Sequence, residues 1–124
     1  MAKEQQLNRD RSTDLGVVRI SNDAIAAIAS IAAMEVKGVE RMGGGVSRAF
    51  VDFLLNRFSS RGVSIHMHES EVKLIVSIIV EYGVDIPRVA DEVQESVKRA
   101  VEKMAGLILT EVDVVVEGVR SRTV

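Results

Sequence analysis

The sequence contains no cysteine, a single proline and only four aromatic residues, three phenylalanines and one tyrosine. The absence of cysteine excludes disulfides, thiolate zinc sites and cysteine nucleophiles, and it suits a reducing compartment. The formal net charge is only −2, so the chain has no bulk electrostatic attraction to phosphate backbones or anionic lipid. We therefore expect a cytoplasmic protein that does not bind nucleic acid.

Long apolar segments are also missing. The longest nearly uninterrupted one covers residues 24–34 and has about half of the ~20 residues that a membrane-spanning helix needs. The first ten residues contain no apolar stretch after their charges, so we expect no secretory signal. Direct membrane insertion is not expected, and any membrane association would come from a partner.

The length and composition indicate one domain. The chain has 124 residues, of which 47% are hydrophobic, and this is enough for one core but not for two ordinary domains. Residues 1–14 are mostly polar, so burial would not offset the entropy of ordering them. We expect a flexible tail over residues 1–14, a single domain over residues 15–119 and a short C-terminal tail over residues 120–124.

The first half of the domain predicts a strand followed by a helix. Residues 16–20 form a short β-rich run, and Ser21 begins a polar cluster suited to capping a helix. A helix over residues 24–37 is expected to end at Gly38. Because this helix is apolar nearly all round, it is either enclosed in the fold or covered on one side by another chain.

The second half predicts a hairpin, a helix and a last strand. A short helix is expected over residues 46–57, where phenylalanines recur at helical spacing. Residues 63–68 and 72–81 alternate apolar and polar side chains, as two paired strands do. A long amphipathic helix starts near Pro87, and the last strand falls within residues 107–117.

The order β-α-(α)-β-β-α-β predicts an α+β fold with a small mixed or antiparallel sheet and helices packed on one face. A ferredoxin-like βαββαβ arrangement is one candidate topology, because the sequence does not determine strand order. The strand at residues 72–81 has apolar residues on both faces, which indicates a central strand or a strand covered on both sides.

The sequence contains few residues that could form a catalytic or ligand-binding site. His66 and His68 lie on one face of a strand near Glu69 and Glu71 and are the candidate metal ligands, but no third histidine or cysteine exists to complete the set. The glycines at 43–45 lack the Gly-Lys-Ser/Thr end of a phosphate loop. No nucleophile and base are recognisably paired. We expect no metal, no cofactor and no enzymatic activity.

RNA-binding modules of similar size are also disfavoured. A KH module needs a Gly-x-x-Gly loop, which is absent from the sequence. An RRM needs aromatic residues on its sheet, whereas three of the four aromatic residues, Phe50, Phe53 and Phe58, fall in or directly after the predicted short helix.

The excess apolar surface suggests an interface. We expect the interaction residues on the first helix and on the central strand, with the alternative that all of them belong to the core. These residues are Ile25, Ile28, Ile31, Ile75 and Ile79.

Two stretches resemble one protein family. GVVRIS at residues 16–21, followed by AIAAIA at residues 24–29, resembles the start of the alkaline shock / Gls general stress family. IVEYGVDIP at residues 79–87 and VDVVVEGV at residues 112–119 are similar to its most recognisable part. The resemblance covers about residues 15–120.

This resemblance implies a bacterial envelope stress protein of the Gram-positive type with no established active site. It also implies a cytoplasmic location, in some members near the membrane through a membrane-embedded partner. We therefore predict a self-associating scaffold or adaptor, with a membrane-anchored protein as a further partner. A cytosolic regulator of a metabolic enzyme and a metal or small-ligand module at His66 and His68 remain alternatives.

Overall fold

The structure, a computed structural model, describes residues 10–44, 62–68 and 71–121. The predicted short helix at residues 46–57 lies outside these ranges. The elements in chain order are β1 (Asp10–Thr13), β2 (Gly16–Arg19), α2 (Asn22–Met34), β3 (Val39–Met42), β4 (Val63–His68), β5 (Glu71–Glu81), α4 (Ile86–Ala105) and β6 (Glu111–Arg120).

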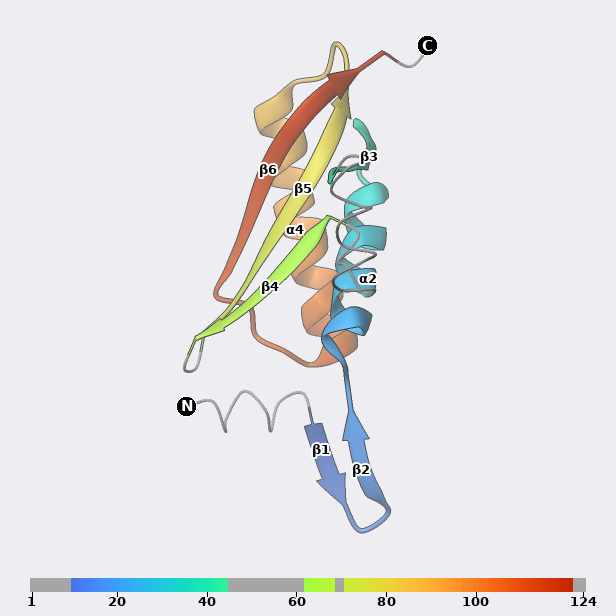
Figure 1. Cartoon of the computed structure of the whole chain (residues 1–124), viewed down its shortest axis with the longest axis vertical. Helices are drawn as coiled ribbons and strands as arrows, with labels where there is room; N and C mark the ends of the chain where they lie inside the picture. Colours follow the sequence, from blue (N-terminus) through green and yellow to red (C-terminus); the bar gives the residue numbers. More distant parts are fainter. Residues whose placement is uncertain (1–9, 45–61, 69–70, 122–124) are drawn as a thin grey trace.

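β5 is the central strand of a mixed four-stranded sheet (Figure 1). Along one edge it pairs in parallel with β6, and along the other it pairs antiparallel with β4 and then with β3. The junction of β3 and β4 lies at Ser77, which donates to the carbonyl of Gly62 and accepts from the amide of Gly43, each at 2.8 Å. The predicted α+β class and the β4–β5 hairpin are thus confirmed.

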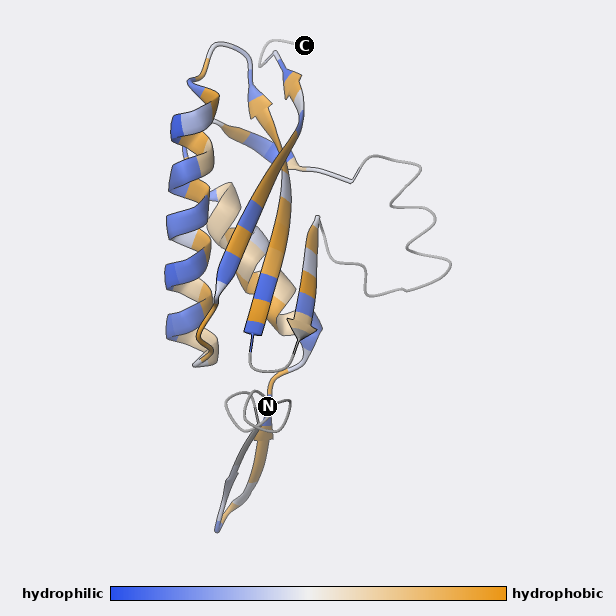
Figure 2. Ribbon diagram, turned by 90° about the vertical axis from the view of Figure 1, so that its left-hand side faces the viewer, coloured by the Kyte–Doolittle hydropathy of each residue, from blue (hydrophilic) through white to orange (hydrophobic). Residues whose placement is uncertain are grey.

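Both helices cover the same face of this sheet (Figure 2). The side chains of β5 that point to this face are fully buried, and so are four valines of α4 that recur at every turn. Alanines on the inner side of α2 let the two helices approach closely, and the Ser96 hydroxyl of α4 donates to the carbonyl of Ala32 at 3.0 Å. The buried residues of β5 are Val72, Leu74, Val76, Ile78 and Val80.

The helix ends follow the capping residues of the sequence. Ser21 caps α2 by accepting from the amide of Ala24, and Asp85 caps α4 by accepting from the amide of Arg88. α2 ends at Met34, three residues before its predicted end, because the chain then turns through Gly38 at φ 106° into β3. The carbonyl of Gly38 accepts from the amide of Glu81, which attaches this turn to β5.

The N-terminal strands differ from the prediction. Among the described strands, β2 does not join the main sheet; it pairs only with β1, and the two form a separate hairpin. Residues 10–13, which were assigned to a flexible tail, therefore have regular structure. The place beside the end of β5 is taken by β3, so the strand order differs from the ferredoxin-like candidate. At the other end, Arg120 belongs to β6, where it pairs with Glu81, and not to a C-terminal tail.

We expect Gly38→Ala to destabilise the fold more than Gly83→Ala. Both glycines have a positive φ, which costs a residue with a Cβ about 1 kcal/mol. At Gly38 the new Cβ would also lie 2.8 Å from the buried side chain of Val89, whereas nothing lies within 4 Å at Gly83. Overpacking should add about 1–3 kcal/mol to the loss at Gly38. Urea unfolding of both variants measures this difference, and equal losses would contradict the packing shown.

Candidate interaction surfaces

One side of α2 carries an apolar stripe that the described residues leave partly exposed. Ile28, Ile31 and Met34 recur at spacings of three; Ile28 is half-buried against the core, Ile31 is 57% exposed and Met34 is 43% exposed. α2 has no charged residue after Asp23, so the stripe is uncharged along its whole length. Ile25 is completely buried and belongs to the core. For this residue, the alternative given from the sequence, a core position and not an interface position, is the one observed.

The second candidate surface is the face of the sheet opposite the helices. Ile75 and Ile79 are half-buried at its centre, and Val115 of β6 lies beside them with 43% of its surface exposed. Charges border this apolar centre: the ammonium of Lys73 lies 3.3 Å from a carboxylate oxygen of Asp113. The surface is therefore a small apolar area with an ionic margin.

The β1–β2 hairpin is a third apolar surface, which the sequence reasoning missed. Leu15 is fully exposed, and Val17 and Val18 are 60% and 56% exposed. Residues 16–20 were predicted as a short strand before the first helix, and the sequence does not show which strand they pair with. Exposure of three large apolar residues on ten residues of chain is unusual for a water-facing surface.

His66 and His68 were the candidate metal ligands of the sequence, and their neighbour Glu69 lies outside the described residues. His66 is exposed on β4 and lies opposite Lys73 of β5, a cation that disfavours a metal ion at this position. His68 is the last residue of the same strand and lies opposite Glu71. Within the described ranges no three His, Cys, Asp or Glu residues are placed to hold a metal ion. Over the same ranges, no helix has the length and hydropathy to cross a membrane.

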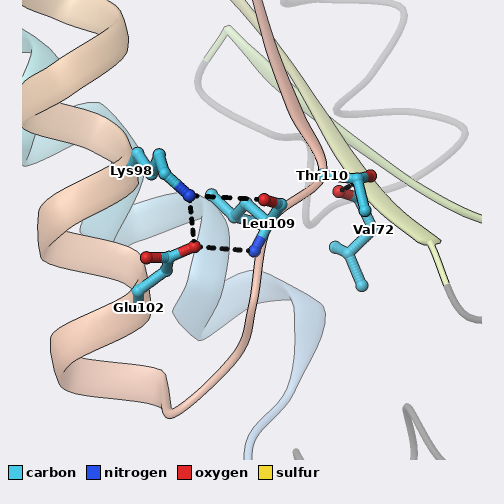
Figure 3. Close-up of polar contacts among 5 residues, drawn as sticks. All are labelled: Val72, Lys98, Glu102, Leu109 and Thr110. Atoms are coloured by element: carbon cyan, nitrogen blue, oxygen red, sulfur yellow. Dashed lines mark hydrogen bonds and ion pairs between the residues drawn. The ribbon is translucent and has the colours of Figure 1, made fainter.

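A shallow depression lies between α4 and the segment that enters β6, but the fold itself uses its polar groups. Lys98 donates to the Glu102 carboxylate at 2.7 Å and to the carbonyl of Leu109 at 3.4 Å, and Glu102 accepts from the amide of Leu109 at 2.9 Å (Figure 3). Gln94 donates to the carbonyl of Val112 on the same side. These contacts attach the end of α4 to the start of β6.

Thr110 attaches the same segment to β5. Its amide and its hydroxyl both donate to the carbonyl of Val72 at 2.9 Å (Figure 3). The connection between α4 and β6 is therefore fixed from two sides, so its polar groups hold the chain and do not form an open ligand site.

Comparison with known proteins gives a consistent result. A family model described as "Asp23 family, cell envelope-related function" matches residues 10–121. YqhY of Bacillus subtilis (strain 168) is 32% identical over 111 residues, which are 90% of this chain and 82% of that protein. YloU of the same strain is 34% identical over 110 residues, which are 87% of this chain and 92% of that protein.

A further relative has a stress-related name. The stress response regulator gls24 homolog of Streptococcus pyogenes serotype M3 is 27% identical over 108 residues. These residues are 86% of this chain but only 60% of that protein. The match of the family model starts at the first residue of β1, so it includes the hairpin.

The Glu102 contacts predict a pH dependence of stability. The hydrogen bond from Lys98, followed by that from the amide of Leu109, holds the pKa of Glu102 below its ordinary value. A lowered folded-state pKa gives stability that is present above the ordinary glutamate value and is lost as the pH falls through the folded-state pKa. Glu102→Gln should therefore cost about 1 kcal/mol at neutral pH, and the difference from wild type should shrink at acidic pH.

The matched control is Glu95→Gln, since the Glu95 carboxylate lies on the same helix, is exposed and is 3.8 Å from Arg99. Exposed pairs of this kind contribute little, so this variant should unfold like wild type. Thermal unfolding between neutral and acidic pH measures both. A Glu102→Gln difference that grows as the pH falls would contradict the assignment.

Proposed function

Because this chain belongs to the Asp23 family of cell envelope-related proteins, we propose that it is a non-enzymatic scaffold or adaptor that acts near the envelope through protein contacts. The family and the relatives named as stress response regulators support an envelope or general stress role. In this proposal the chain associates with itself and also binds a membrane-anchored protein, and it works on the cytoplasmic side of the membrane.

The observation that carries the proposal is the apolar stripe of α2. Apolar residues repeated along one helix face are the usual means by which a helix binds a groove or another helix. Burying a whole isoleucine side chain is worth about 1.5–3 kcal/mol, so the exposed part of Ile31 alone can contribute roughly 1 kcal/mol or more to binding. The stripe offers no charge, so the surface that fits it is apolar as well.

We propose that the location depends on the same surface. An anchored partner would hold the chain at the envelope, and no described helix is suited to crossing a membrane. We assign this partner to the stripe, because α2 has no charged residue after Asp23 and therefore fits an apolar partner surface.

We expect Ile31→Lys to abolish capture of a membrane protein. The substitution places a charge in the stripe, and it should not weaken the fold, because lysine is a good helix former and a cation is favourable in the last turn of α2. The measurement is affinity capture of the tagged chain from separate membrane and soluble fractions, with mass spectrometry of the bound proteins. One membrane protein should be enriched by wild type and lost with Ile31→Lys.

Ile108→Lys is the matched control, since Ile108 is similarly exposed but lies in the connection between α4 and β6. It should capture the same membrane protein as wild type, also at raised salt. Equal capture by Ile31→Lys would exclude the stripe as the binding surface. A metabolic enzyme as the main protein captured, only from the soluble fraction, would replace the scaffold with the cytosolic regulator.

A further inference from the structure

The part of the chain that the structure describes adds no third strand to the β1–β2 hairpin. It extends from the start of α2 beyond the end of the main sheet (Figure 1), and within the described chain its strands pair only with each other. Its turn is ordered, because the Thr13 hydroxyl accepts from the amide of Leu15 at 3.1 Å. An isolated two-stranded ribbon is only marginally stable in water, and a third strand or a covering helix is needed to stabilise it.

β6 also has a strand neighbour on one side only among the described strands. It is ten residues long and forms one edge of the main sheet, and among the described strands it pairs only with β5 (Figure 1). Sheet edges are normally protected by charged side chains, especially lysine, by proline or by a bulge. β6 contains neither proline nor lysine, and its register is irregular only near Gly118, opposite the step from Ile78 to Ile79. The charged residues in its regular part are Glu111 and Asp113, and both carboxylates lie near the ammonium of Lys73 on β5. Residues 111–116 thus offer a regular edge longer than the four residues of β2.

We propose that the hairpin of one copy adds through β2 to the outer edge of β6 in a second copy. This inference rests on the proposed self-association and names the surfaces that perform it. The added strand would supply the third strand that the hairpin lacks and the outer neighbour that β6 lacks. Val17 and Val18 would then lie beside the valines of β6, of which Val115 is the most exposed in the regular part of the edge.

Charge also favours a second copy as the occupant. β6 carries three carboxylates and one arginine, so its net charge is −2. The hairpin, residues 10–19, carries Asp10, Arg11, Asp14 and Arg19 and is neutral, with Arg19 opposite Asp10. Two β6 strands side by side would repel each other, whereas a neutral hairpin beside β6 would not. Each copy has one hairpin and one β6 edge, so in an assembly of identical chains every hairpin can pair with one β6 edge.

Association of this kind is head-to-tail. The surface used on one copy differs from the surface used on the next. An open assembly therefore always has an unused hairpin at one end and an unused β6 edge at the other. Copies therefore continue to add and form rings or open chains, and growth does not stop at a symmetric dimer.

The experiment is sedimentation of the full chain over a range of concentrations, alone and as mixed variants. Val17→Asp removes the hairpin contact, and Val115→Lys places the usual protecting residue of edge strands on β6. Both side chains are exposed, so neither change removes core packing. Val18→Asp is a second hairpin variant, and Ile31→Lys on α2 is the control that leaves both surfaces intact.

Wild type and Ile31→Lys should form species larger than dimers, and each hairpin or β6 variant alone should be monomeric. An equimolar mixture of Val17→Asp and Val115→Lys should give dimers and nothing larger, because only one kind of junction remains. If both hairpin variants assembled like wild type, the strand-addition inference would be wrong, but the proposed self-association would still hold. The same conclusion would follow if wild type assembled and the mixture of Val17→Asp and Val115→Lys stayed monomeric. A wild type that is monomeric at every concentration would overturn both.

Discussion

The burial of one face of β5 is the constraint on which the rest of the structure depends. Five alternate residues of this strand, from Val72 to Val80, are inaccessible to solvent, and both helices are needed to cover them. The strand is also paired along both edges, by β6 on one side and by β4 and β3 on the other. Since β5 uses its edges and one face in this way, the surfaces of the described residues that remain for partners are the outer side of α2, the opposite face of the sheet, the edge of β6 and the separate hairpin.

The α2 stripe and the hairpin, where partners are expected, are apolar. Polar side chains, in contrast, fix the connection between α4 and β6. Lys98, Glu102 and Thr110 attach the segment between α4 and β6 to its neighbours, and this sets the position of β6 relative to α4. The α2 stripe and the hairpin carry large apolar side chains that are exposed at Ile31, Met34, Leu15, Val17 and Val18, and of the stripe only Ile28 also packs against the core. The division supports a protein that acts by contact, with a stable sheet that presents several docking surfaces.

Local sequence signals predicted the local structure well. The capping residue Ser21, the start of α4 near Pro87, the valine stripe of α4 and the alternation in β4 and β5 appear where the pattern placed them, because each depends on neighbours within a few residues. The pairing of β2 with β1 and of β3 with β5 was not predictable, because strand partners are chosen by distant residues. For the interface, the uniformly apolar α2 gave no means of separating buried Ile25 from exposed Ile31, and the exposure of the hairpin valines follows only from its separation from the sheet.

Backbone hydrogen exchange at low and high protein concentration tests the central claim, self-association through peripheral strands, most directly. The account predicts that amides of β2 and of residues 111–116 become more protected as the concentration rises, because strand addition gives them hydrogen-bond partners. Amides inside α2 already have partners within the helix and should not change. Protection of β2 and β6 that is independent of concentration would contradict it.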